Sequence, residues 1–279
     1  MINDIAYLLK EWFSEDIGDG DHSSFSCIPS NAMGTSRLLV KEDGVIAGVE
    51  VAKQVFAHFD NTLQVTVFIP DGTKVKKGDI VFDVTGNVRS LLQTERLMLN
   101  IMQRMSGIAS VTRVYVDELQ GLATKVLDTR KTTPGLRFLE KMAVKIGGGH
   151  NHRFGLYDMI MLKDNHVDFA GGIRNAIVAA QTYCKEKQKD LKIEIEVRNF
   201  EELNEVLQVG GVHRIMLDNF SVENTQKAVA IIQGKYEIES SGGITLGTLR
   251  QYALCGVDYI SVGALTHSVK SLDLSFKAV

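Results

Sequence analysis

Cysteine is scarce in this sequence, and long apolar runs are missing. The 279 residues include three cysteines, Cys27, Cys184 and Cys255, which lie far apart and form no CxxC pair. This spacing argues against a disulfide framework and a structural zinc site, and it indicates a reducing compartment. No window has the length of a membrane span, and the first 21 residues do not resemble a secretory signal. We therefore expect a cytoplasmic protein without a membrane role.

A strong excess of charge is missing too. The formal net charge is −3, and 44% hydrophobic and 23% charged residues are typical of a soluble globular protein. This balance gives no support for nucleic-acid binding. Residues 125–163 nevertheless carry eight Lys or Arg against three Asp or Glu. A solvated helix face would explain this local excess as well as an anion site would, and charge alone leaves both open.

The first third of the chain predicts a mixed domain of strands and helices. Apolar positions at helical spacing predict a helix at residues 2–14. Valines and isoleucines alternate with charged residues at 36–48 and 63–86, with DG or GD turns, and this predicts strands. Residues 91–119 change to a helical period, so we expect one or two long helices with a mostly buried face.

Part of this strand-rich segment has a second interpretation. Residues 69–86 resemble the turn region of biotinyl and lipoyl carrier domains, which would make this half a binding module. Those domains present a modified lysine in a tight hairpin with a characteristic flanking tripeptide, which this sequence lacks. We therefore favour a β-rich accessory domain.

From Lys125 onward, short apolar runs that end in polar residues alternate with helical segments. Such alternation predicts parallel βα units, and we count six strands. The segment at 270–279 alternates again and is predicted to return to the first domain as a strand. The six runs lie at 125–131, 158–166, 192–197, 213–219, 236–243 and 258–263, and the helical segments at 171–187, 199–208, 221–234 and 245–256.

The carboxyl ends of these strands are the informative positions. In βα barrels the residues that do chemistry lie there and in the loops that follow. Polar residues also end strands because turns need them, so no single position is decisive. Together they predict a pocket with cationic and anionic walls. They are Asp128, Arg130, Lys131, Lys163, Asp164, Asn165, Glu194, Glu196, Asp218, Asn219, Ser240, Ser241 and Gly263.

Two motifs contribute cations. DTRKTTPGLR places Arg130 beside Lys131, a planar fork and a compact charge for a carboxylate or phosphate. GGGHNHRFGLYD follows three glycines with His152 and Arg153, and such runs allow a backbone to approach an anion closely. The alternative is structural: a solvated turn before a helix would explain the first motif, and a tight turn would explain the glycines of the second. A metal site of His150, His152 and His166 is disfavoured, because arginine and lysine crowd these histidines.

Four further motifs lie at the ends of the later strands and contain carboxylates or glycine-rich loops. IEIEV and IMLDN place Glu196 and Asp218 at adjacent strand ends, where carboxylates could hold Mg²⁺, bind ribose hydroxyls or stabilise positive charge on a sugar ring. Ion pairing with lysines is the alternative. ESSGGI and SVGALTHS resemble the last two loops of barrels that hold a phosphate on backbone N–H groups.

In this order, the motifs resemble the quinolinate phosphoribosyltransferase family. The resemblance implies an incomplete six-stranded α/β barrel at residues 109–269. It also implies an N-terminal α+β domain, an open β sandwich with helices, at 1–108 and 270–279. Departures at Tyr157 and Met161 fall where we expect change to be tolerated. The motifs are EDIGDGDHSS, GVIAG, DGTKVKKGD, ERLMLNIMQRMSGIAS, DTRKTTPGLR, KIGGGHNHRFGLYDMIMLKDNH, IEIEV, IMLDN, ESSGGI and GVDYISVGALTHS.

The resemblance also implies an activity, the transfer of phosphoribose from phosphoribosyl pyrophosphate to quinolinate in NAD biosynthesis. The products are nicotinate mononucleotide, pyrophosphate and CO₂, and Mg²⁺ is the cofactor. It further implies a homodimer, with or without higher assembly, in which Arg104 reaches the neighbouring subunit's site. The implied quinolinate-binding residues are Arg104, Arg130, His152, Arg153 and Lys163; Lys131 and His267 lie near pyrophosphate, Glu196 and Asp218 near ribose and Mg²⁺, and Ser241, Gly242, Gly243 and Gly263 at the 5′-phosphate. Lys131, Lys163, Glu196 and Asp218 are the implied catalytic residues.

Two alternatives stay open. One is a paralogue of the same fold that is associated with molybdenum transport, and the set of implied quinolinate-binding cations argues against it. The other is a Schiff-base aldolase that uses Lys163 at its strand end. An aldolase lysine needs a lowered pKa, whereas a dicarboxylate site needs a charged lysine.

Overall fold

The computed structural model describes residues 5–279, which form two compact units. Among the described residues, the first unit contains 5–111, 145–148 and 269–279, and the second contains 112–144 and 149–268. The division expected from the sequence differs by a few residues at each boundary and does not assign 145–148 to the first unit. Residues 2–4 of the predicted opening helix lie outside the described part. Its remainder belongs to α1 (Ala6–Ile17).

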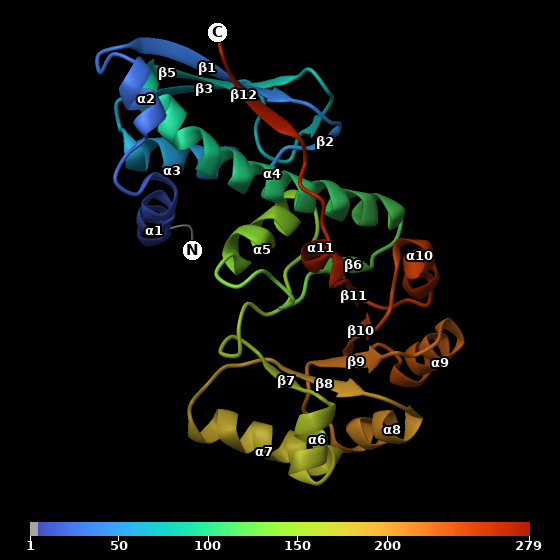
Figure 1. Cartoon of the computed structure of the whole chain (residues 1–279). Helices are drawn as coiled ribbons and strands as arrows, with labels where there is room; N and C mark the ends of the chain where they lie inside the picture. Colours follow the sequence, from blue (N-terminus) through green and yellow to red (C-terminus); the bar gives the residue numbers. More distant parts are fainter. Residues whose placement is uncertain (1–4) are drawn as a thin grey trace. The chain divides into compact units, whose positions relative to one another are not determined.

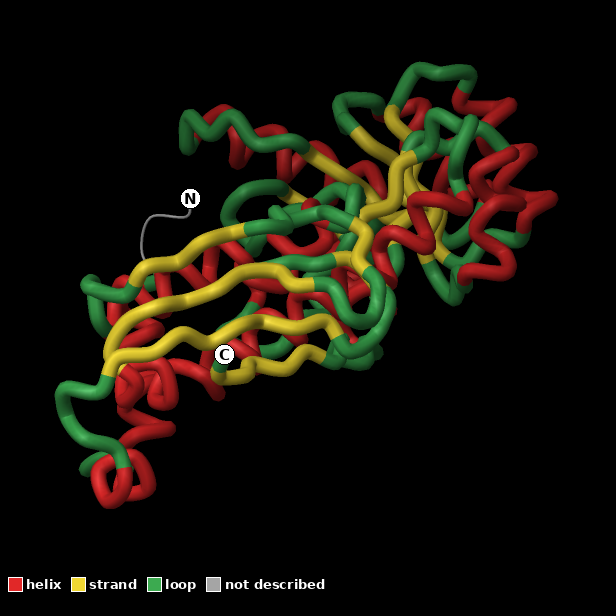
Figure 2. Tube along the Cα trace, turned by 90° about the horizontal axis from the view of Figure 1, so that it is seen from above, coloured by secondary structure: helices red, strands yellow, loops and turns green. Residues whose placement is uncertain are grey.

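An antiparallel sheet forms the centre of the first unit. Its order is β12–β1–β5–β3, with β12 at Leu274–Ala278, β1 at Met33–Val40, β5 at Ile80–Asn87 and β3 at Gln64–Val67. Figure 2 shows these four strands side by side with helices behind them. The prediction that the end of the chain returns to this domain is confirmed, because β12 pairs with β1. Two short strands, β2 (Gly44–Val45) and β4 (Lys74–Val75), form a separate pair.

Three more helices complete this unit, and the sequence predicted only the longest of them. That helix, α4 (Val88–Glu118), is a single helix where one or two were expected. A short helix, α2 (His22–Cys27), begins after Asp21, whose side chain accepts the Ser24 N–H. The third, α3 (Val49–Phe59), follows Gly48, which has a positive φ of 101° and no side chain to cap a helix. Asp71 caps α3 instead, because its carboxylate accepts the Val49 N–H at 2.8 Å.

A parallel sheet of six strands forms the second unit and confirms the predicted incomplete barrel. The order is β6–β11–β10–β9–β8–β7, and each neighbouring pair is parallel. The end strands β6 and β7 do not pair with each other among the described strands, so the barrel is open. The strands are β6 (Lys125–Leu127), β7 (Ile160–Leu162), β8 (Ile193–Val197), β9 (Arg214–Asp218), β10 (Glu237–Ser241) and β11 (Tyr259–Ser261).

Helices surround the outside of this sheet (Figure 1). The four predicted helices are confirmed within one or two residues. Asn199 and Ser221 cap two of them by accepting the N–H groups of Glu202 and Asn224. The helices of this part of the chain are α5 (Arg137–Ile146), α6 (Asp164–Ala170), α7 (Ile173–Glu186), α8 (Phe200–Val209), α9 (Val222–Ile232), α10 (Leu246–Leu254) and α11 (Ala264–His267).

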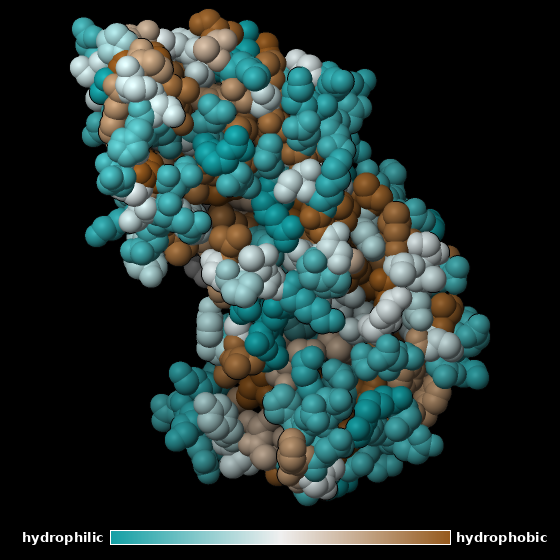
Figure 3. Space-filling model, in the orientation of Figure 1, coloured by the Kyte–Doolittle hydropathy of each residue, from teal (hydrophilic) through white to brown (hydrophobic). Residues whose placement is uncertain are grey.

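The surface is mixed in polarity. Hydrophilic and hydrophobic residues are interspersed on the face shown in Figure 3. Among the described residues, no helix combines the length and the apolar character that crossing a membrane requires.

Candidate active site

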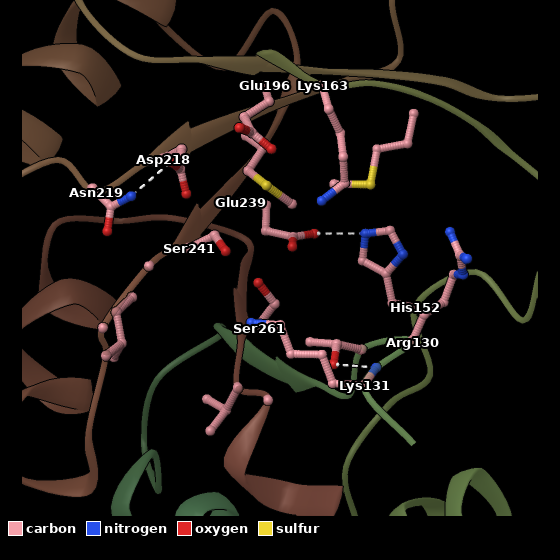
Figure 4. A pocket seen from close by; sticks show the side chains of 18 of the residues that line it. Arg130, Lys131, His152, Lys163, Glu196, Asp218, Asn219, Glu239, Ser241 and Ser261 are labelled. Atoms are coloured by element: carbon pink, nitrogen blue, oxygen red, sulfur yellow. Dashed lines mark hydrogen bonds and ion pairs between the residues drawn. The ribbon is translucent and has the colours of Figure 1, made fainter. Parts of the chain in front are cut away.

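A cavity of about 690 Å³ opens at the carboxyl ends of the barrel strands. It brings together every site residue implied by the family resemblance except Arg104, whereas four of the predicted strand-end residues, Asp128, Asn165, Glu194 and Ser240, do not line it. Figure 4 shows Arg130 and His152 on one side of this space, Asp218 and Asn219 on the opposite side, and Glu239 between them. The predicted residues that line it are Arg130, Lys131, His152, Arg153, Lys163, Glu196, Asp218, Ser241, Gly242, Gly243, Gly263 and His267.

Arg104 is not among the residues that line the cavity. It lies on α4 in the first unit, where its guanidinium donates to the Val269 carbonyl at 3.2 Å. Of the two departures from the family pattern, Tyr157 is exposed, as a tolerant position should be. Met161 is buried and lines the cavity, so the expected tolerance stays a prediction there. A substitution at Met161 would change the shape of the cavity.

The loop after β6 carries Arg130 and Lys131 on its exposed surface, and the surrounding hydrogen bonds hold its main chain. The Lys131 N–H donates to the Thr129 hydroxyl at 3.0 Å, and the Lys131 carbonyl accepts the Thr266 hydroxyl at 2.7 Å. Thr266 lies on α11, so the strand-end loop of β6 is tied to the loop after β11. The backbone is therefore fixed while both cationic side chains remain free to meet an anion.

A buried ion pair supports the neighbouring loop that carries His152. Lys141 is 2% exposed and donates to Asp128, which is 0% exposed. Burial raises the pKa of Asp128 although Lys141 opposes this shift. Asp128 also accepts the His152 N–H at 2.9 Å, and Lys141 donates to the His152 carbonyl at 3.1 Å. The main chain of His152 is thus held at both its donor and its acceptor by two ionised groups.

The His152 ring points at two buried carboxylates. Its Nε2 lies 3.1 Å from Glu194 and 3.5 Å from Glu239, and Arg214 lies 2.9 Å from Glu239. Burial works against a charged ring, but the hydrogen bonds and charges of the two carboxylates raise the pKa of His152 to about 9. The pKa of Glu194 rises to about 7, first because it is buried and then because Glu239 is close.

The facing wall contains the two carboxylates predicted from the sequence. Burial and the charge of Asp218 raise the pKa of Glu196, and the charge of Lys163 opposes this rise. These directions place Lys163, Glu196 and Asp218 within electrostatic reach of one another. The Asn219 amide donates to Asp218 at 2.6 Å and orients its carboxylate.

A glycine turn closes the remaining side. Gly242 and Gly243 follow β10 with φ values of 93° and 62°. A Cβ atom on Gly242 would lie 2.2 Å from the Asn219 side-chain oxygen, so only glycine fits there. The turn leads into α10, whose amino end is a favourable place for an anion. Gly263 is less crowded, because its Cβ would lie 3.0 Å from the His267 ring and a small shift of that side chain would admit it.

Several residues of the cavity wall had no predicted role, and Asn219 and Glu239 are the two whose polar side chains make the contacts described above. Asn219 appeared only as a polar strand end, and Glu239 only as the first letter of a phosphate-loop motif. The strand register would have found Glu239, since it aligns with Met216 and Met216 aligns with Glu196. Side chains at one level of a parallel sheet share a face.

An enclosed set of cations, a carboxylate pair and a glycine turn at an open α/β barrel define a transferase of phosphorylated sugars. A family model described as the C-terminal domain of quinolinate phosphoribosyl transferase matches residues 108–277. The corresponding N-terminal domain model matches residues 21–106. The chain belongs to the quinolinate phosphoribosyltransferase family, which confirms the resemblance seen in the motifs.

Similar proteins agree with this assignment. The chain is 44% identical to a chloroplastic, carboxylating nicotinate-nucleotide pyrophosphorylase of Arabidopsis thaliana, over 98% of this chain and 82% of that protein. It is 42% identical to a probable protein of the same name from Bacillus subtilis, over 96% of this chain and 91% of that one. The solved structure of NadC from Streptococcus pyogenes has a TM-score of 0.92 at 42% identity, over 98% and 96% of the two chains.

Proposed function

We propose that this protein transfers phosphoribose from phosphoribosyl pyrophosphate to quinolinate and releases pyrophosphate and CO₂, the product being nicotinate mononucleotide for NAD biosynthesis. One observation carries the proposal. A single cavity holds Arg130, His152, Arg153 and Lys163 together with the Gly242–Gly243 turn. The relatives of this protein are named for the activity in both directions: some as decarboxylating transferases and others as carboxylating pyrophosphorylases.

The cationic side of the cavity suits the acid. Quinolinate is a dianion, so its transfer from water into the cavity costs free energy unless charged donors replace its hydration. Arg153 is 9% exposed, and burial followed by the charge of Arg130 lowers its pKa. Two cations that repel each other in this way gain from an anion placed between them. We assign the quinolinate carboxylates to this side and the 5′-phosphate to the glycine turn.

The chemistry then needs positioning and charge, with no covalent nucleophile. The pyridine nitrogen forms a bond to the anomeric carbon as the bond to pyrophosphate breaks. Glu196 and Asp218 stabilise the positive charge that develops on the ribose ring. The ring nitrogen is now cationic, so it accepts the electron pair left when the 2-carboxylate departs as CO₂. A proton then takes its place on that carbon.

Magnesium fits the carboxylate wall. Each of Glu196 and Asp218 offers the hard oxygen ligands that Mg²⁺ prefers, and their mutual repulsion, which contributes to the raised pKa of Glu196, would be relieved by a cation. We propose that these two side chains hold it, directly or through water. When bound, Mg²⁺ would neutralise charge on the pyrophosphate leaving group.

We also propose a homodimer in which Arg104 completes the neighbouring subunit's site. The basis is the family resemblance, together with the absence of Arg104 from its own cavity's lining residues among those described. In a two-fold dimer the same patch would serve both subunits. A cytoplasmic location stays a prediction from cysteine usage.

The decisive experiment measures the release of labelled CO₂ from quinolinate. Quinolinate labelled in its 2-carboxylate is incubated with phosphoribosyl pyrophosphate, with and without Mg²⁺, and released CO₂ is counted. We expect release that needs both additions, together with nicotinate mononucleotide in equal amount. Lys163→Ala should abolish it. Lys192→Ala removes an exposed lysine before the amino end of β8 and is the matched control. Label released without phosphoribosyl pyrophosphate would contradict the proposal.

A further inference from the structure

A layer of charged side chains forms part of the cavity wall, at Glu196 and Glu239, and continues beneath it, where a barrel normally has branched apolar residues. The strand register places Glu194 and Glu237 level with Arg214, and Glu196 and Glu239 one level higher with Met216. Glu194 and Glu239 are both 0% exposed. Arg214 lies between them, 2.9 Å from Glu239 and 3.8 Å from Glu194.

Stability alone does not account for this layer. Replacing a buried ion network by apolar residues of similar volume is often neutral or stabilising. Both oxygens of Glu194, one oxygen of Glu239 and the Nε2 atom of His152 are buried without a hydrogen bond of normal geometry, although Nε2 lies within ion-pair distance of both carboxylates. The charges of the two carboxylates are therefore balanced by proximity to two cations, the Arg214 guanidinium and the His152 ring. His152 is the member of this pair that lines the cavity.

We propose that Glu194, Glu239 and Arg214 are positioning residues that fix the ring of His152 in the cavity wall for recognition of the substrate's carboxylates. The main chain of His152 is already held from the other side by Asp128 and Lys141. The two carboxylates remove the remaining freedom, the rotation of the ring. This inference rests on the proposed function for its substrate.

The same three side chains, His152, Glu194 and Glu239, could by type hold a metal ion. Arg214 argues against a metal, because a guanidinium at hydrogen-bond distance already balances Glu239. The charged groups that face His152 are Glu194 on β8, Arg214 on β9, Glu239 on β10 and Lys141 of α5, which donates to its carbonyl. The backbone N–H of Arg153 donates to the ring at Nδ1, over 2.7 Å.

The test uses Glu239→Gln, which keeps the shape and removes the charge. Glu237→Gln is the matched control. Glu237 lies on β10 like Glu239 and contacts Arg214 at 3.2 Å, but its side chain is 35% exposed. We expect Glu239→Gln to raise KM for quinolinate about tenfold or more and to leave KM for phosphoribosyl pyrophosphate within about twofold. Glu237→Gln should leave both unchanged. A folded Glu239→Gln enzyme with wild-type KM for quinolinate would overturn the proposal.

A second measurement does not depend on the variant folding. Imidazole nitrogen NMR of the wild type, with the His152 signal assigned by its loss in His152→Gln, should show an Nε2 proton that is protected from exchange with solvent, because Nε2 lies 3.1 Å from Glu194 and 3.5 Å from Glu239. An Nε2 proton that exchanges as fast as that of an exposed histidine would overturn the proposal. If the wild type releases no CO₂ from quinolinate, the proposed function fails, while this protection still decides whether the buried layer holds the ring.

Discussion

The two sheets of this molecule differ in what fills the space beside them. Against the antiparallel sheet of the first unit, Phe56, Phe82 and Phe276 pack with ring centroids 6.0 to 6.4 Å apart. Inside the parallel sheet of the second unit, Glu194, Glu239 and their cationic partners occupy the equivalent interior. The residues buried against the first sheet are apolar, whereas those buried inside the second include ion pairs.

This difference separates stability from chemistry along the chain. Apolar burial stabilises a fold wherever it occurs, so the core of the first unit only requires side chains that fill its volume. Buried ions need specific partners at specific distances, because losing one partner leaves the other charge uncompensated. A substitution in the core of the first unit should therefore change unfolding, and one at the cavity should change turnover. Each prediction below tests that separation.

The largest effect should come from the aromatic core. Phe82 is 0% exposed, and Phe82→Ala should lower the free energy of unfolding by about 3–5 kcal/mol. Phe68 is 52% exposed, so Phe68→Ala is the control and should change it little. Denaturant unfolding measures both. The folded fraction of Phe82→Ala should keep wild-type KM values, and altered KM at unchanged stability would contradict the separation.

The reverse pattern should hold for Lys163. Its exposed side chain projects from a strand end, so Lys163→Ala removes charge from the cavity and no packing from a core. We expect kcat/KM to fall by roughly 2–4 kcal/mol in transition-state stabilisation, with an unchanged melting temperature. Activity above half of the wild-type value would refute its assigned role.

Stability should also depend on pH through His152. Its folded pKa of about 9 exceeds the ordinary 6.5, so the charged ring stabilises the fold fully below pH 6.5. This contribution, about 3 kcal/mol at most, should be lost as the pH rises from 6.5 to 9. Unfolding of the wild type and of His152→Gln across this range measures it. Parallel curves would show that the ring is not held by the carboxylates.

Substrate choice should follow from the cationic wall. Nicotinate lacks the 2-carboxylate, so cations that meet this group would be left without a partner. We expect kcat/KM for nicotinate to be at least about a hundredfold below that for quinolinate. Equal use of both acids, compared in the same assay, would mean that the substrate is wrongly assigned.

The smallest effect concerns Arg104. Arg104→Ala and Lys163→Ala are each confirmed inactive, then unfolded, mixed equally and refolded. If Arg104 serves the neighbouring subunit, half of the dimers are mixed and each contains one intact site, so activity should return to roughly a quarter of wild type. If it serves its own subunit, every site stays damaged. No recovery, with subunit exchange verified by mass, would exclude the shared site.

The sequence by itself determined the elements that depend on neighbours along the chain. The six barrel strands, four of the helices between them and the long helix α4 follow from the hydrophobic period within one segment, whereas α5 and α6 were not among the predicted helices. Strand ends meet at one edge of a parallel sheet, so most of the charged cavity residues were also predictable, although Asp128 and Glu194 turned out to lie outside the lining. The motif order was enough to identify the family.

The tertiary structure decided what depends on residues far apart in the chain. Helix α3 has its cap in Asp71, 22 positions after Val49, so no local pattern announced it. The layer of Glu194, Arg214 and Glu239 exists only once β8, β9 and β10 are in register. The sequence shows only that a residue has a carboxylate side chain. Whether it is solvated, or buried against a histidine with a raised pKa, is set by the strands that surround it.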